Sequence, residues 1–361
     1  MKSSMRFLLL LIVGIWIFVA YLFIMGPENI IAEILKANLW LLLLAFPLDI
    51  AFMLLFGVGW YVLLKNIEKR VPLKGCIAVA MVSLFGDVMV PTGTVTGEAI
   101  RLALAKKKLN IGVNKALASI IVHRIVNLMA FIFYFMVGLV LFWNIESSNI
   151  GLLAILVLAL ITMGGGLFCI RYISKSKGAQ EFLRKVSEKI LKAFKKGNYS
   201  NALIKYNINE FCQAVDTMFS RPYVVLLSFI IFICQWAAAI TIPYIVFMSL
   251  GHEVPYSLVA AAYPIYSLSL MIPIGIPAML GVVETSMTAT FVALGIPSAI
   301  ASSASILTRI IVVWFEVAVT GSITALYSAD VFSELFKKGG SRNSMHSEKP
   351  KAITGLQCNV S

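Results

Sequence analysis

The sequence has few charged residues, few cysteines and few histidines for its length. Only 13% of its 361 residues are charged, whereas soluble globular chains have about 25%. The five cysteines form no CxxC pair and the three histidines are scattered, so neither a disulfide framework nor a metal site is predicted. The sequence also has no Walker loop and no dinucleotide-binding fingerprint. We therefore expect no enzyme and no bound cofactor.

The chain instead has long apolar runs. Hydrophobic residues make up 60% of it, and its mean hydropathy is +0.92. Runs of about 20 apolar residues can cross a bilayer as helices, and these runs lack the alternation of membrane β-strands. The sequence predicts an all-α polytopic membrane protein, with crossing helices in residues 6–25, 39–64, 113–143, 150–170, 222–250 and 297–327.

The net charge of +13 lies mainly in short segments between the apolar runs. Basic segments mark the cytoplasmic side, so we expect both termini in the cytoplasm and the protein in the plasma membrane. The expected partners are anionic lipid headgroups rather than nucleic acid. Residues 171–221 predict a basic amphipathic helix on the inner membrane surface; a linker helix packed against the inner face is the alternative.

Two apolar stretches are interrupted by glycine and proline and do not fit a simple crossing. Basic residues flank residues 75–96 on both sides, so this stretch is predicted to enter the membrane and return as a re-entrant helical hairpin. Residues 258–294 must then do the same from the outside. The breaks are assigned to Pro91, Gly93 and Gly97 in the first hairpin and to Pro273, Gly275, Pro277 and Gly281 in the second.

The order of two helices, a hairpin and a long tilted helix occurs twice. Each half also places a glutamate and an arginine at nearly the same spacing, Glu98 with Arg124 and Glu284 with Arg309. Because the halves start from opposite sides, they predict an inverted-topology repeat, as in many secondary transporters. The predicted segments are the first repeat (1–143), the outer loop and helix that open the second (144–170), the cytoplasmic amphipathic segment (171–221), the rest of the second repeat (222–328) and a cytoplasmic polar tail (329–361).

Arg124 and Arg309 are predicted to lie near the membrane midplane. Each lies roughly 16–18 Å into its helix at about 1.5 Å per residue, and the hydrocarbon core is about 30 Å thick. A charge at this depth needs compensation. Two explanations stay open. Glu98 and Glu284 form structural ion pairs with the arginines, or the arginines bind an anionic headgroup through paired hydrogen bonds while the glutamates orient or gate them.

Other polar residues are candidates for the same site. Asn127 lies one turn after Arg124 on the same face and is a candidate headgroup contact, as is Arg101. Acids within apolar segments are costly if they face lipid. Three such acids are predicted to line the cavity: Asp49, Asp87 and Glu316.

Four motifs, "PTGTVTGEAIR", "ALASIIVHRIVN", "PIGIPAMLGVVE" and "ILTR", resemble one family. It is the flippase-like membrane region of lysylphosphatidylglycerol synthases, also found as free-standing integral membrane proteins and fused to archaeal dolichyl-phosphate glycosyltransferases. The resemblance covers residues 5–328. Gly97, Glu98 and Arg101 match its pattern, whereas the separated Gly275 and Gly281 depart from its Gly-Gly turn.

The resemblance implies a translocase for an anionic or modified lipid, or for a lipid-linked sugar, working by alternating access. It does not imply lysyl-lipid synthesis, because nothing in this sequence matches the soluble aminoacyl-transferase domain. One alternative is a non-transport subunit that anchors a lipid-modifying enzyme or glycosyltransferase. Another is an ion-coupled small-solute transporter with Glu98 and Glu284 as proton or cation sites. Oligomeric state is not predicted.

Overall fold

The computed structural model describes residues 3–90, 95–142, 150–193, 201–272 and 274–338, and in these all regular secondary structure is helical. Within these residues, six helical stretches are long and apolar enough to cross a membrane. They are α1 (Ser3–Met25), α3 and α4 (Leu39–Leu43 and Ala45–Ile67), α7 (Val113–Phe142), α8 (Ile150–Lys175), α11 (Pro222–Ser249) and the continuous helix α14–η3–α15 (Ser298–Arg309, Ile310–Phe315 and Glu316–Lys338). The prediction of an all-α polytopic membrane protein is confirmed.

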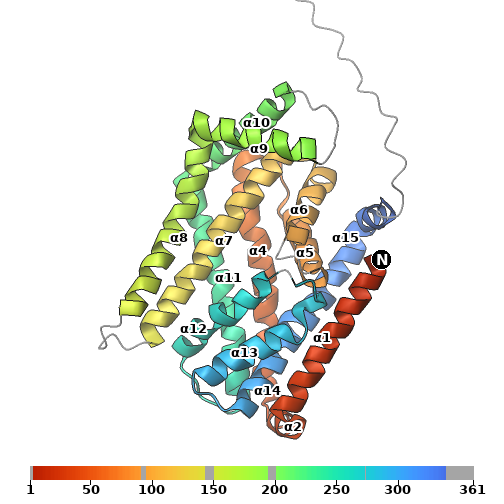
Figure 1. Ribbon diagram of the computed structural model, residues 1–361, viewed down its shortest axis with the longest axis vertical. Helices are drawn as coiled ribbons and strands as arrows, with labels where there is room; N and C mark the ends of the chain where they lie inside the picture. Colours follow the sequence, from red (N-terminus) through yellow and green to blue (C-terminus); the bar gives the residue numbers. More distant parts are fainter. Residues whose placement is uncertain (1–2, 91–94, 143–149, 194–200, 273, 339–361) are drawn as a thin grey trace, which may run out of the picture.

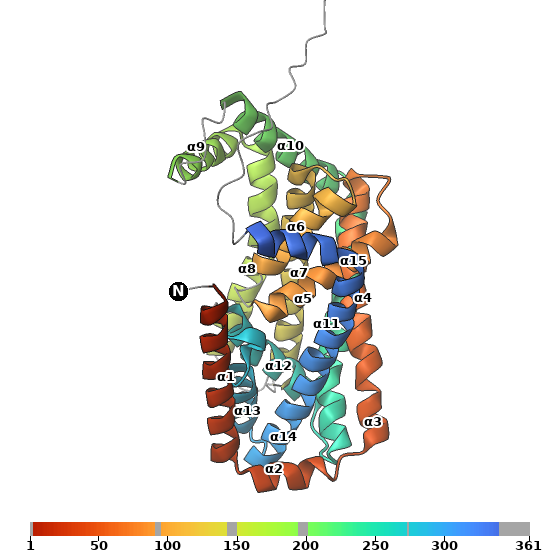
Figure 2. The same cartoon turned by 90° about the vertical axis from the view of Figure 1, so that its right-hand side faces the viewer.

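The long helices form one elongated bundle (Figure 1). α4 and α11 pack along each other, and both contact α7. α1 stands along one edge of the bundle, next to α13 (Figure 2). A short helix that the sequence did not predict, α2 (Pro27–Ile34), follows α1 at one end and packs against α14.

Two pairs of shorter helices lie where the hairpins are predicted. α5 (Leu73–Met89) packs against α6 (Val95–Lys108). α12 (Tyr256–Ser267) packs against α13 (Val282–Ala293), and the 3-10 turns η1 (Leu268–Met271) and η2 (Pro277–Met279) lie between them. The first pair lies in the half of the bundle nearer α9 and α10, and the second in the half nearer α2 (Figures 1 and 2). That each pair enters and leaves the membrane on one side stays a prediction.

Several of the predicted breaks have special backbone or packing requirements. Gly97 lies so close to α5 that a Cβ there would be 2.5 Å from the Ser83 carbonyl oxygen. Gly275 and Gly281 have φ of +81° and +80°, which glycine adopts at little cost. Pro277 begins η2. Three of the predicted break residues, Pro91, Gly93 and Pro273, lie outside the described residues.

The basic segment 171–221 divides into several helices. α8 continues to Lys175, and α9 (Lys177–Ala193) and α10 (Asn201–Phe219) follow across one end of the bundle (Figure 1). α10 packs against α7 and α8 through apolar side chains such as Val215 and Met218. On α9, Phe182 is 66% exposed, as expected of a helix that lies on a lipid surface. That role stays a prediction.

Candidate functional site

A cavity of about 460 Å³ lies between the two pairs of shorter helices. Its lining comes from α4, α5, α7, α11 and α12, from η1 and η2, and from the junction of α14 with α15. Much of the wall is aromatic or aliphatic, including Phe52, Phe131 and Trp236. This volume suits a small-molecule or headgroup site, and an apolar wall with few polar groups is usual for such sites.

The structure brings six of the predicted site residues to this one cavity. They come from α4, α5, α7 and the continuous helix α14–η3–α15. The six are Asp49 on α4, Asp87 on α5, Arg124 and Asn127 on α7, Arg309 on α14 and Glu316 on α15. Their role in binding a substrate stays a prediction.

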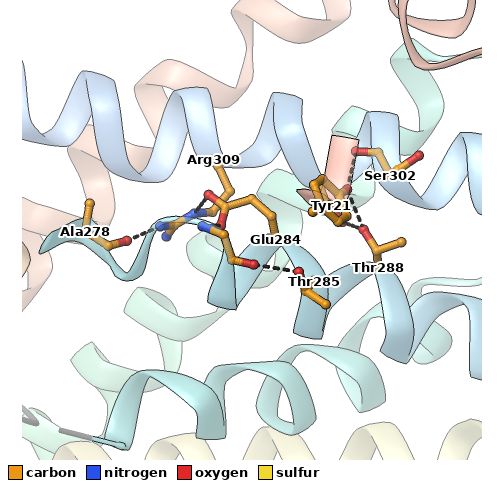
Figure 3. Close-up of polar contacts among 9 residues, drawn as sticks. Tyr21, Ala278, Glu284, Thr285, Thr288, Ser302 and Arg309 are labelled. Atoms are coloured by element: carbon orange, nitrogen blue, oxygen red, sulfur yellow. Dashed lines mark hydrogen bonds and ion pairs between the residues drawn. The ribbon is translucent and has the colours of Figure 1, made fainter. Parts of the chain in front are cut away.

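Arg309 is buried and bonds to residues of η2 and α13 (Figure 3). Its Nε donates to Glu284 Oε1 at 2.8 Å, and its Nη2 donates to the carbonyl oxygen of Ala278. The second carboxylate oxygen of Glu284 accepts from the Gly281 backbone N–H at 2.8 Å, at the start of α13. A carboxylate is favourable there because the first turn of a helix has free N–H groups.

The backbone that meets Arg309 has an uncommon conformation. Ala278 and Met279 have φ of 54° and 51°, in the left-handed region that non-glycine residues seldom adopt. Such residues persist only when their surroundings enforce the conformation. The hydrogen bond from Arg309 to the Ala278 carbonyl supplies part of that constraint, so Arg309 joins the long helix to the turn before α13.

Arg124 is less buried than Arg309, and one of its donors has no hydrogen-bond partner among the described residues. Its Nε donates to Glu98 Oε1 at 2.6 Å, and the two side chains are 32% and 30% exposed. Its Nη2 is buried and has no hydrogen-bond partner among the described residues. An unsatisfied buried donor on a cavity wall favours a ligand that can accept the missing bond.

The two glutamates lie behind the arginines rather than in the cavity wall. Both spacing-based ion pairs, Glu98–Arg124 and Glu284–Arg309, are present, but neither glutamate belongs to the described cavity lining. The acids that do line it are Asp87, Asp49 and Glu316. Asp87 accepts from the backbone N–H of Gly97 at 2.7 Å, near the start of α6.

Arg101 does not belong to the lining of this cavity, and its contact with a headgroup stays a prediction. It is 1% exposed, and its guanidinium stacks over Phe56 and Trp60 at 5.0 and 5.4 Å from the ring centroids. Its Nη1 is 3.3 Å from His123 Nδ1. Cation–π contacts and the adjacent imidazole partly compensate a buried charge. Arg101 therefore joins α6 to α4 and α7 within the first half of the bundle.

Some lining residues were missed by sequence reasoning. Gln235 is uncharged, and its Oε1 accepts a hydrogen bond from Asn127 Nδ2 at 2.8 Å. Trp236 Nε1 donates to the Asn127 carbonyl oxygen at 3.2 Å. Tyr263 lines the wall from α12. Of these, only Gln235 could have been predicted from the sequence, because a polar amide is unusual in an apolar run long enough to cross the membrane.

A π-helical turn lies between two of the predicted residues. Ile310–Phe315 forms it, directly after Arg309 and before Glu316. π-turns within α-helices occur frequently at functional sites. Val312 and Val313 of this turn also line the cavity, so the irregular part of the long helix is the part that faces it.

Comparison with known proteins matches this chain to one family over a range that includes every residue of the cavity lining. The family model described as "Lysylphosphatidylglycerol synthase TM region" matches residues 10–320. A UPF0104 membrane protein of Methanothermobacter thermautotrophicus is 22% identical over 335 residues, which cover 91% of this chain and 98% of the relative. A UPF0104 membrane protein of Pyrococcus horikoshii is 26% identical over 330 residues, covering 88% and 96%. The chain belongs to the family of the lysylphosphatidylglycerol synthase transmembrane region.

Proposed function

We propose that this protein is a translocase that moves an anionic or modified lipid, or a lipid-linked sugar, between membrane leaflets. It performs no chemical step in this proposal. The observation that carries it is the cavity, to which each half of the chain contributes an arginine, Arg124 from the first and Arg309 from the second. Membership of a family named for a lipid-synthesising enzyme's membrane region supports a lipid as the substrate.

The two arginines have different roles in this proposal. Arg309 is already bound to Glu284 and Ala278, so it positions the turn before α13. The Nη2 of Arg124 has no hydrogen-bond partner in the described part of the chain, and Arg124 is the residue proposed to bind a phosphate oxygen, which a guanidinium does well. The apolar wall lowers the local dielectric and strengthens this contact. The lipid tails stay in the surrounding bilayer.

The arrangement of the helices supports alternating access between two inverted halves. The two pairs of short helices lie toward opposite ends of the bundle (Figure 1), and both contribute to the cavity wall. Six crossings would leave both termini on the same side. The basic segments between the apolar runs favour the cytoplasmic side of the plasma membrane for both termini. Relative rocking of the halves would expose the cavity to each leaflet in turn.

Arg124→Gln is expected to reduce lipid translocation by about 10- to 100-fold, because a hydrogen bond to a charged group contributes about 1.5–3 kcal/mol. The measurement is movement of labelled phosphatidylglycerol and labelled polyprenyl phosphate across proteoliposome membranes. Lys115→Gln is the matched control, because Lys115 is on the same helix but contacts Glu68 at 3.3 Å, outside the cavity lining.

The control variant should move lipid at the native rate. Thermal unfolding of each purified variant shows whether a slow rate reflects lost binding or lost folding. Native-rate transport by Arg124→Gln would remove this arginine from the mechanism. If the native protein moves neither probe, the alternative of a non-transport membrane subunit takes the place of the translocase.

A further inference from the structure

Two buried acids in the cavity are not used by the proposed headgroup contact. Asp49 is 2% exposed and Glu316 is 7% exposed, and both belong to the cavity lining. Neither forms an ion pair with a described basic side chain, and Arg124 and Arg309 pair instead with Glu98 and Glu284. A buried ionised carboxylate without a partner is costly. The two acids therefore need another source of compensation.

The packing of α4 against the π-turn brings these acids near each other. Phe46 and Phe315 form an edge-to-face contact with ring centroids 4.9 Å apart. Asp49 follows Phe46 by about one helical turn, and Glu316 is the next residue after Phe315. Both acids line the same cavity, on either side of the place where α4 contacts the π-turn.

The surroundings offer little that would stabilise two negative charges. Asp49 Oδ2 is buried and has no hydrogen-bond partner among the described residues. From the other elements around the cavity, Asp87 on α5 adds a third carboxyl group and Tyr263 on α12 adds a phenol. Arg309 and Arg124 also line the cavity, but their ion pairs are with Glu284 and Glu98 rather than with these two acids. Two buried carboxylates that share one cavity do not both ionise readily.

We propose that Asp49 and Glu316 together bind one proton, and that its uptake allows the cavity to accept an anionic headgroup, so that proton and lipid cross the membrane in the same direction. The proton comes from water on the side to which the cavity is open and forms an O–H bond on one carboxylate oxygen. It returns to water when the cavity opens on the other side. This inference rests on the proposed function, whose anionic substrate would otherwise meet the negative charges of these acids.

The coupling has a definite sign. Proton uptake removes one negative charge from the cavity, so an anionic headgroup should bind more tightly as the pH falls. If one proton is taken up for each headgroup, the affinity changes by about tenfold per pH unit. Removing either acid should remove this dependence, because the site then carries one charge fewer at every pH.

The first test is binding of dioctanoyl phosphatidylglycerol to the full chain in detergent between about pH 5 and 8, where the phosphodiester keeps its single charge. Trp236 lines the cavity and provides a fluorescence signal. The native protein should bind up to about tenfold more tightly per unit fall in pH. Asp49→Asn and Glu316→Gln should bind with little pH dependence. Asp216→Asn is the matched control, because Asp216 lies on α10 and accepts from Ser174 at 2.8 Å; it should behave as the native protein does.

The second test detects the proton directly, whether or not lipid binds. Infrared difference spectra of the native protein at high and low pH should show a protonated carboxyl band that is lost in Asp49→Asn and Glu316→Gln but kept in Asp216→Asn. Absence of the band, or its persistence in both cavity variants, overturns the inference. So does lipid binding that depends on sodium at constant pH. If the band is present and no lipid binds, the proposed function fails while the proton site stands.

Discussion

Replacing Glu284 by leucine is expected to lower the free energy of unfolding by about 3–5 kcal/mol, because removal of one partner from a buried ion pair leaves an uncompensated charge. Glu284 is 2% exposed and contacts both Arg309 Nε and the Gly281 N–H. Its loss therefore weakens both the long helix and the start of α13. The measurement is unfolding of the purified protein in mixed micelles, followed by circular dichroism.

The double variant Glu284→Leu with Arg309→Met should recover most of this loss. A buried ion pair replaced by apolar residues of similar size is often close to neutral, whereas the single removal is not. Glu181→Gln is the control for an exposed pair, since Glu181 is on α9 and contacts Arg184; its expected change is within about 0.5 kcal/mol. A double variant no more stable than Glu284→Leu would show that the pair is not the source of the effect.

Gly281→Ala is expected to cost about 2–5 kcal/mol, the second large effect. The residue has φ of +80°, where a Cβ costs about 1–2 kcal/mol. That Cβ would also lie 2.6 Å from the backbone nitrogen of Phe18 on α1, and overpacking of this kind adds about 1–3 kcal/mol. The measurement is the unfolding free energy in the same micelles.

Gly251→Ala separates the two contributions to the effect. Gly251 has φ of +75°, but a Cβ there would meet no atom within 4 Å. It should therefore lose only the backbone part, about 1–2 kcal/mol. If both variants lose equally, α1 does not approach α13 as closely as the structure has it. The approach is also held by the Tyr21 hydroxyl, which is 2.8 Å from Thr288 Oγ1 (Figure 3).

The sequence predicted much of the architecture because the relevant signals are local. Crossing helices require long apolar runs, and six helical stretches of that kind are present at the expected positions. The ion pairs Glu98–Arg124 and Glu284–Arg309 were among the options that spacing left open, because a buried arginine requires an acid within reach. α2 was missed because a helix of 8 residues has no long apolar run to mark it.

The direction in which each polar side chain points was decided by tertiary packing. Arg101 and Arg124 are both arginines of the first half of the chain, yet Arg101 lies against Phe56 and Trp60 while Arg124 lines the cavity. Likewise, Asp49 and Glu316 were each expected to line a cavity, but their proximity depends on how α4 meets the π-turn. Composition and spacing determined which residues must be compensated inside a membrane protein. Only the contacts between helices distant in sequence determined which of them received a partner and which remain available to a ligand.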